Sequence, residues 1–380
     1  MTDIEKCAPS RKVESLSCYS LNSLRHFAKV INDETKFKIN SIRNKSKKIL
    51  WKEIYDIMMK LYSCKTEICW LKNGMVDKLP KSVKEEVTKD TFLPFMPRSW
   101  ESNKNEWLNT NDIAAVLRQY EDLYSDFQLF GPTPIDFDLK ETDGTCKVDD
   151  LCSIDIKQLL KNGIHKIGIV FNTDPHYKSG QHWISLYVDL YDDNCLMNGD
   201  SNTNFGGKPT NKRKSKRSVR KRLSKKKRRS KRKHSRVKYN NDVKHEYIVH
   251  NKEYDMKKHD IKEINNGKLL NNEDLQNKSK DDKRCSGMYY FDSQGVKPPD
   301  NVVKLMENLC QQGEECNITF QKLYNDIQHQ QKNTECGIYS IHFITNMLNG
   351  MTFKKYIEDI RDDKKIEEYR DVFYVDQRKI

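Results

Sequence analysis

The sequence lacks any apolar run long enough to span a membrane, and its first ten residues are polar and charged rather than a secretory leader. Apolar residues make up only 36% of the 380 residues, which is a low share for a folded chain. These scarcities argue against a membrane-embedded protein. We expect an intracellular protein with one large domain plus appendages, or with two ordinary domains.

Cysteine pairs with CxxC spacing are also missing, although the chain has eleven cysteines. The close pairs stand at positions 64/69, 146/152 and 310/316, and none has the spacing of a zinc knuckle. The cysteine count is odd, and no secretory signal is recognised. We therefore expect mostly free thiols in a reducing setting, and we predict no metal site.

Acidic residues are absent between Lys212 and Lys238, where 18 of 27 residues are Lys or Arg. The whole chain has 69 basic and 55 acidic side chains, which gives a net charge of +14. The rest of the chain has 51 basic and 55 acidic side chains, so the positive net charge comes from this segment. Such a run can bind nucleic acid or another polyanion, act as a nuclear-targeting signal, or remain a solvated loop. It contains no interleaved aromatic residues, so base stacking is not expected.

Composition and periodicity divide the chain into several parts. Residues 1–90 hold two helical patterns, LNSLRHFAKVIN and ILWKEIYDIMMKLY, and we predict an N-terminal accessory module there. Residues 91–355 mix helix and strand patterns and form the predicted main domain. This domain is interrupted at residues 195–285 by a basic insertion of low apolar content, which we expect to be largely disordered. Residues 356–380 form a predicted charged helical tail.

Two strand patterns flank the insertion and would otherwise form a tight hairpin. The first, HWISLYVDL, alternates cleanly, so His182 and Ile184 share one face and Trp183 and Ser185 share the other. The second is SGMYYFDS. Because paired antiparallel strands place the start of one beside the end of the other, His182 and Asp292 should meet at one end of the sheet.

A carboxylate beside an imidazole fixes the tautomer of the imidazole and stabilises the imidazolium. The alternative interpretation of His182 and Asp292 is an ordinary polar cross-strand pair. The His182–Asp292 pair alone does not distinguish these two interpretations; a nucleophile nearby would favour the catalytic one. The sequence supplies a candidate for that group about 40 residues downstream.

Cys336 opens the helical pattern ECGIYSIHFITNML, and a helix N-terminus or a nearby imidazolium lowers the pKa of a thiol. Gly337 has no Cβ and would leave room for a substrate backbone beside the sulfur. Gln330 could donate to a developing oxyanion, although Gln328 and Gln331 are rivals on this argument alone. The alternative interpretation of Cys336 is a buried core thiol.

The order of these motifs resembles the ubiquitin-like-protein-processing cysteine proteases, the superfamily of SUMO proteases and adenovirus endopeptidase (adenain). That family has a His followed by Trp, an Asp or Asn on the next strand, a Gln for the oxyanion hole and a Cys-Gly nucleophile. The resemblance assigns catalytic roles to His182, Asp292, Gln330 and Cys336, and it selects Gln330 over the neighbouring glutamines. It covers residues 92–348 without the insertion.

Two further residues follow from the same pattern. Trp183 is expected to pack near the site, either as a substrate contact or as a core aromatic, and Gly337 is expected to border the substrate. The implied fold is α+β and adenain/SUMO-protease-like, with a central mixed β-sheet flanked by helices and the nucleophile at the N-terminus of a core helix. The segments HWISLYVDL, YYFDSQGVKPP and NTECGIYSIHF are most similar to thiol proteases assigned to large DNA viruses.

The implied function is a cysteine endopeptidase that needs no cofactor and cleaves viral structural precursors at Gly-containing sites during virion maturation. One alternative is a protease that removes SUMO or another ubiquitin-like modifier from its conjugates. Another is a polyanion-binding virion protein with a vestigial protease fold. Expected partners are protein substrates, with nucleic acid or another polyanion at residues 212–238 and no membrane. The expected location is the virion and the host cytoplasm, with the nucleus as an alternative.

Overall fold

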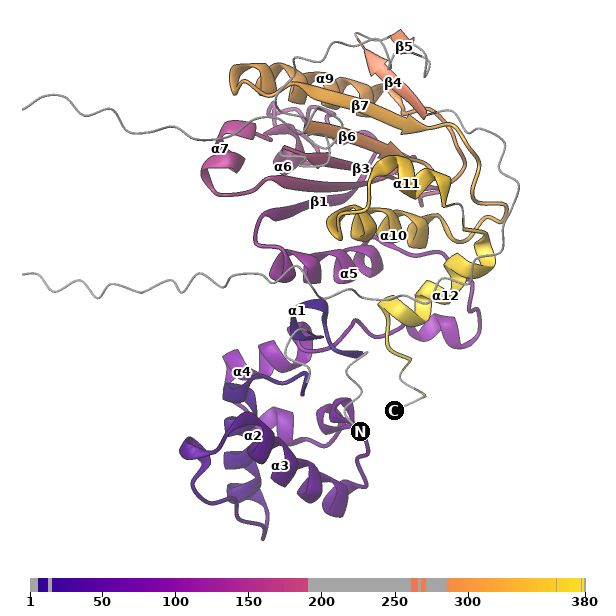
Figure 1. Ribbon diagram of the computed structural model, residues 1–380. Coiled ribbons are helices and arrows are strands. Elements are labelled where there is room, and N and C mark those ends of the chain that lie inside the picture. The colour runs from indigo at the N-terminus through magenta and orange to yellow at the C-terminus, as the bar shows by residue number, and fades with distance from the viewer. Residues whose placement is uncertain are drawn as a thin grey trace, which may run out of the picture. The chain divides into compact units, whose positions relative to one another are not determined.

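The computed structural model contains a seven-stranded mixed sheet (Figure 1). The structure describes residues 6–12, 16–190, 261–265, 268–270, 286–359, 361–376 and 378, with only the backbone described between 261 and 270. The strands are β1 (Phe127–Pro134), β2 (Lys166–Asn172), β3 (Trp183–Asp189), β4 (Ile261–Asn265), β5 (Lys268–Leu270), β6 (Ser286–Phe291) and β7 (Phe320–Asn325). They lie in the order β1-β2-β3-β6-β7-β4-β5. The predicted fold class is confirmed.

Strand directions in this sheet are mixed. The pairs β1/β2 and β6/β7 are parallel, whereas β2/β3 and β3/β6 are antiparallel. The predicted hairpin across the insertion is therefore present as β3 and β6. The short strand β4 pairs with β5 and with β7, and it lies within residues 195–285, which we expected to be largely disordered. The rest of the insertion, including the basic run, lies outside the described residues.

Helices cover both faces of the sheet, and the alternation along β3 explains why. Trp183 and Tyr187 belong to a core that includes α5 (Thr110–Leu123) and α10 (Cys336–Leu348). Ile184 and Leu186 belong to another core with α6 (Asp149–Cys152), α7 (Ile156–Lys161) and α9 (Asp300–Glu315). Both faces of β3 are thus buried, as successive side chains point to opposite sides of a strand.

The helix that carries Cys336 begins where the sequence predicts. Cys336 is the first residue of α10, and Gly350, with φ +83°, follows the end of the helix. Two further helices follow: α11 (Phe353–Glu358) crosses the predicted boundary at residue 355, and α12 (Asp363–Phe373) lies within the predicted C-terminal tail. They are not loosely attached, because Phe353, Ile366 and Phe373 are buried in the same core as α10.

The N-terminal region is helical and has its own hydrophobic core. Its helices are α1 (Pro9–Lys12), α2 (Leu21–Glu34), α3 (Lys47–Tyr62) and α4 (Lys81–Glu85) (Figure 1). Ser20 and Ser46 cap α2 and α3 by accepting backbone N–H groups of the first turns. Residues 6–8 also pair with residues 91–93, since Ala8 N–H donates to Thr91 O and Cys7 bridges to Phe92. The domain boundary at residue 90 stays a prediction.

The expectation of mostly free thiols is wrong. Six cysteines form the disulfides Cys7–Cys18, Cys64–Cys69 and Cys146–Cys152, and among the described residues only Cys310, Cys316 and Cys336 are free. The fold brings the paired Cα atoms to within 5.1, 5.5 and 6.3 Å, which is the separation that a disulfide requires. Sequence spacing alone does not show this proximity, and it is least informative for Cys7 and Cys18, which are the farthest apart in sequence.

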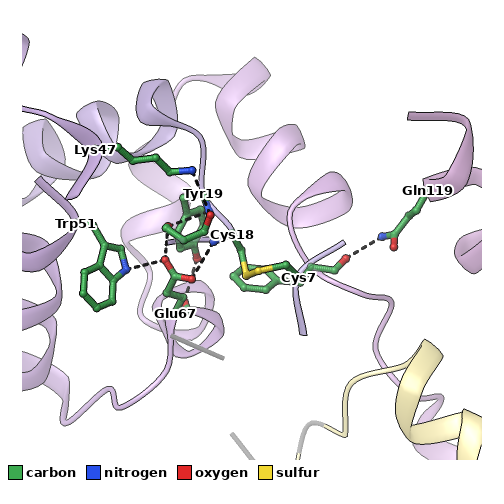
Figure 2. Close-up of a disulfide and its surroundings, with 9 residues drawn as sticks. Cys7, Cys18, Tyr19, Lys47, Trp51, Glu67 and Gln119 are labelled. Atoms are coloured by element: carbon green, nitrogen blue, oxygen red, sulfur yellow. Dashed lines mark hydrogen bonds between the residues drawn. A yellow bond between two sulfur atoms is a disulfide. The ribbon is translucent and has the colours of Figure 1, made fainter. Parts of the chain in front are cut away.

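The disulfide Cys7–Cys18 lies beside a buried carboxylate (Figure 2). Glu67 accepts hydrogen bonds from Ser17 Oγ, from Cys18 N–H at 3.0 Å and from Trp51 Nε1 at 2.7 Å. On the other side of the disulfide, Gln119 of α5 donates to Phe92 O at 2.8 Å. The cross-link therefore lies between hydrogen bonds that involve Trp51 of α3 on one side and Gln119 of α5 on the other.

We expect the double substitution Cys7→Ser/Cys18→Ser to lower the free energy of unfolding by about 3 kcal/mol. The disulfide closes a loop between cysteines separated by 11 positions, and its removal restores entropy to the unfolded chain. Urea denaturation without reductant measures the loss. Cys310→Ser, at a free cysteine, is the control and should change the stability little. Equal stability of the wild type and the double variant would contradict the role given to this cross-link.

Candidate active site

His182 and Asp292 lie together at one end of the β3–β6 hairpin. The pairing of Ser185 with Phe291 places the residue before β3 next to the residue after β6. His182 Nε2 is 2.7 Å from Asp292 Oδ1, and both residues are buried. The two strand patterns in the sequence therefore predict this pair correctly.

Asp292 is held rigidly by a residue that the sequence analysis did not identify. Its N–H donates to Asn325 Oδ1 at 2.9 Å, and Asn325 Nδ2 donates back to Asp292 O at 2.8 Å. Gln294 N–H donates to the same carboxylate oxygen that faces His182, at 2.8 Å. Asn325 is the last residue of β7, and only the adjacency of β6 and β7 reveals its position.

Cys336 completes the cluster at the N-terminus of α10. It is 1% exposed, and its thiol lies close enough to His182 to raise the pKa of the imidazole. Since Nε2 of His182 faces Asp292, Nδ1 is the ring nitrogen left for the sulfur. The residue before Cys336, Glu335, provides no side-chain cap, and the first N–H groups of a helix have no acceptor inside the helix. The amide of Cys336 is thus oriented as an anion donor.

The surroundings of His182 favour its charged form. Burial lowers its pKa, but hydrogen bonds to Asp292 and Cys336 and their negative charges raise it more, to about 9. An imidazolium at neutral pH implies that the proton of a Cys336–His182 pair can reside on the histidine. A neighbouring imidazolium favours the thiolate form of a cysteine, which is the form that attacks a carbonyl carbon.

The three nearby glutamines differ sharply in environment. Gln330 is 1% exposed, whereas Gln328 and Gln331 are exposed. The side chain of Gln330 accepts a hydrogen bond from Ser293 Oγ at 2.7 Å and donates one from Nε2 to Lys332 O at 2.6 Å. These two bonds fix its amide plane and leave one N–H for another acceptor. Gln330 is the glutamine whose orientation is defined, and its role at an oxyanion stays a prediction.

The expected open space at Gly337 is taken by the protein itself. A Cβ on Gly337 would lie 2.9 Å from Leu108 Cβ and 3.0 Å from Leu108 Cδ1. Trp183 holds this leucine in place, because its indole Nε1 donates to Leu108 O at 2.8 Å. Glycine therefore admits Leu108 rather than leaving room for a substrate backbone. Trp183 is 5% exposed and acts as a core aromatic beside the nucleophile.

An exposed tryptophan next to this contact was not among the predicted site residues. Trp107 directly precedes Leu108 and is 37% exposed, which is unusual for so large an apolar side chain. It stands two residues before Asn109, the N-cap of α5. Its position beside the Leu108–Gly337 contact makes it a candidate for contact with a substrate.

We expect Gly337→Ala to lower peptide turnover about tenfold and to cost about 1–3 kcal/mol of stability, because the added methyl overpacks against Leu108. Thermal unfolding and hydrolysis of a peptide measure the two effects. Leu108→Gly removes the closest atoms, so in that background Gly337→Ala should add little further loss, although Leu108→Gly itself costs stability because its buried side chain is lost. A Gly337→Ala variant equal to the wild type would contradict the close packing.

Other sites for ligands are few among the described residues. No group of three or more His, Cys, Asp and Glu side chains in this part of the chain is arranged to hold a metal ion. A cavity of about 340 Å³ is bordered by Trp100, Arg370 and neighbouring charged residues, and it includes none of the predicted catalytic residues. Within the described ranges, no helix has the length and apolar character needed to cross a membrane.

Comparison with known proteins gives relatives along the whole chain but no match to a protein-family model. The chain is 24% identical to a candidate thiol protease of Acanthamoeba polyphaga mimivirus, over 98% of this chain and 93% of the mimivirus protein. It is 32% identical over 87 residues to the SUMO-1 cysteine protease of African swine fever virus, over 23% of this chain and 32% of that protease. The crystal structure of an African swine fever virus protease superposes with a TM-score of 0.53 at 17% identity, over 99% of this chain and 97% of the other.

These similarities confirm the resemblance that the motifs indicate. The superposition shows a shared fold, and the sequence relatives are named thiol or cysteine proteases. The chain is therefore a cysteine-type peptidase, similar in sequence to proteases of mimivirus and African swine fever virus and similar in fold to the latter.

Proposed function

We propose that, as a cysteine protease of the SUMO-protease type, the chain is an endopeptidase that acts through Cys336, His182, Asp292 and Gln330. The observation that carries this proposal is the buried His182–Asp292 pair at 2.7 Å, whose imidazole lies beside a thiol at the start of a helix. Such an arrangement serves acyl transfer because it supplies a nucleophile, a proton carrier and an orienting carboxylate.

The proposed reaction follows from the geometry. The Cys336 thiol gives its proton to His182, and the thiolate attacks the carbonyl carbon of the scissile bond. The amides of Cys336 and Gln330 stabilise the oxyanion. His182 returns the proton to the leaving amine as the carbon–nitrogen bond breaks. Water then attacks the thioester, which releases the acyl product and restores the thiol. Asp292 keeps the imidazole oriented throughout.

The proposed substrates are viral structural precursors cleaved at Gly-containing sites during virion maturation, in the virion and the host cytoplasm. Support comes from the similarity to proteins of African swine fever virus and mimivirus, both large DNA viruses. A second candidate is the release of ubiquitin-like modifiers from conjugates. The name SUMO-1 cysteine protease, carried by African swine fever virus relatives, favours it.

Two electrophilic probes test the proposal and separate the candidates. One probe ends in a Gly-Gly peptide electrophile, and the other carries the same electrophile on the C-terminus of SUMO. We expect both to label Cys336 and His182→Ala to prevent labelling. Labelling by the peptide at a rate similar to that by SUMO favours precursor cleavage, whereas a strong preference for SUMO favours deconjugation. A folded protein that neither probe labels would support the third candidate, a polyanion-binding protein with a vestigial protease fold.

The basic segment supports a proposed polyanion partner, nucleic acid in the first place, and nuclear entry as an alternative role. Its 18 Lys and Arg residues among 27 give a charge density suited to phosphates. Deletion of residues 212–238 spares β4 and should abolish salt-sensitive retention on immobilised DNA. Retention unchanged by the deletion would contradict this partner.

A further inference from the structure

Helix α12, which lies in the predicted C-terminal tail, holds the loop between Gln330 and Cys336. Asp363, the first residue of α12, is 5% exposed despite its charge. Its Oδ2 accepts the backbone N–H of Gln331 at 2.9 Å and that of Lys332 at 2.6 Å. One carboxylate oxygen thus holds two consecutive amides of the loop that carries the predicted oxyanion donor.

The same carboxylate is anchored to the helix of the nucleophile. Its Oδ1 lies 3.2 Å from the hydroxyl of Tyr339, which belongs to α10 and donates to Arg361 O at 2.8 Å. Tyr339 stands three residues after Cys336, on the next turn. Asp363 therefore connects the loop to α10.

The consequence for Gln330 is direct. Gln330 Nε2 donates to Lys332 O at 2.6 Å, and the position of Lys332 depends on the bond from its N–H to Asp363. Ser293 binds the other end of the amide, at Oε1. These two bonds fix the direction of the remaining N–H of Gln330. Asp363 therefore orients that N–H indirectly, by holding Lys332.

A second contact from α12 holds the other end of the loop. Arg370 Nε and Nη2 donate to the two carboxylate oxygens of Glu335, each at 3.1 Å, and both side chains are buried. Arg370 Nη2 also donates to Glu106 O at 2.9 Å, and its guanidinium stacks over Trp100 at 4.5 Å. Glu335 directly precedes Cys336, so this ion pair fixes the start of α10.

We propose that Asp363 and Arg370 are positioning residues, which hold the oxyanion donor and the nucleophile in register from α12. This inference rests on the proposed function. Between the two contacts the loop is exposed at residues 331–333, so it depends on these anchors for its shape. A buried carboxylate bonded to two amides, and a bidentate arginine–glutamate pair, are strong and directional contacts.

Asp363→Ala is the decisive variant, because removing the carboxylate releases the two loop amides without changing Cys336 or His182. We expect kcat for a peptide to fall at least about tenfold, with KM within twofold, as for the loss of an oriented oxyanion donor. Affinity for a peptide aldehyde, which forms a tetrahedral adduct, should fall by a similar factor. Alkylation of Cys336 by iodoacetamide should stay within twofold of the wild type, since it needs no oxyanion hole.

Two variants complete the test. Asp363→Asn keeps one acceptor oxygen for both amides and an N–H for the Tyr339 oxygen, so it should retain most of the activity. Glu368→Gln removes a carboxylate from an exposed position of the same helix and should change nothing. Thermal unfolding must show Asp363→Ala folded at the assay temperature.

The outcomes separate the two proposals. A folded Asp363→Ala variant with wild-type kcat overturns the positioning role and leaves the proposed function intact. The same holds if turnover, alkylation and aldehyde binding all fall together with the melting temperature, because this pattern shows only a structural role. A wild-type protein that neither turns over peptide nor reacts with the aldehyde overturns the proposed function, and the positioning role with it.

Discussion

Cys336→Ala is expected to abolish peptide hydrolysis, with a loss of about 10⁴-fold or more in kcat. The thiol is the proposed nucleophile, and no other free cysteine among the described residues lies in the same cluster. His182→Ala should cause a loss of the same order, because the thiol then lacks the group that takes its proton. Turnover of a fluorogenic Gly-containing peptide measures both effects.

The two substitutions act on one catalytic unit, so their effects should not add. The double variant Cys336→Ala/His182→Ala is expected to be about as inactive as either single variant. Cys310→Ala is the matched control, because this free thiol lies on α9 and burial raises its pKa. Full activity of a folded Cys336→Ala variant would remove Cys336 from the mechanism and refute the proposed function.

The sequence predicts the parts of the site that depend on local pattern and strand direction. His182 and Asp292 could be paired because alternating side chains mark β3 and a second β-rich run follows the insertion. The helical period after Cys336 places it at a helix start. These inferences require only the periods of strands and helices and the antiparallel geometry of one hairpin.

The sequence does not predict contacts that depend on the packing of distant segments. Asp363 and Arg370 lie in a charged tail, and nothing in their spacing indicates that they face residues 331–335. Leu108 fills the space at Gly337 only because α5 packs against α10. Strand β1 was missed because FGPTP contains a glycine and two prolines, which ordinarily argue against a strand.

The disulfides illustrate the same limit. Cys7 and Cys18 meet because residues 6–8 pair with residues 91–93 and return to the start of α2, a long-range arrangement with no sequence signal. The count of eleven cysteines does not show which thiols form disulfides. The pairing of Cys7 with Cys18 depends on the assembly of the N-terminal core.

Asp292→Ala should shift the pH dependence of activity. In the wild type, His182 has a raised pKa of about 9, so the imidazolium that would protonate the leaving amine is present below that pH and is lost as pH rises through it. The kcat/KM profile should therefore fall above about pH 9. Folding stability from this raised pKa is likewise complete below pH 6.5 and disappears as pH rises toward 9.

Removing the Asp292 carboxylate takes away a hydrogen bond and a charge that raise the His182 pKa, while burial still lowers it. The alkaline limb of kcat/KM should move down by about one pH unit or more, and kcat at pH 7 should fall about 10²-fold to 10³-fold. Asp292→Asn keeps an acceptor for His182 Nε2 but has no charge. The alkaline limb of its kcat/KM profile should therefore lie between those of the wild type and Asp292→Ala. A pH profile of kcat/KM for the three proteins decides the matter. An unchanged limb in Asp292→Ala would mean that Asp292 neither orients nor charges His182, and that the 2.7 Å contact is an ordinary polar pair.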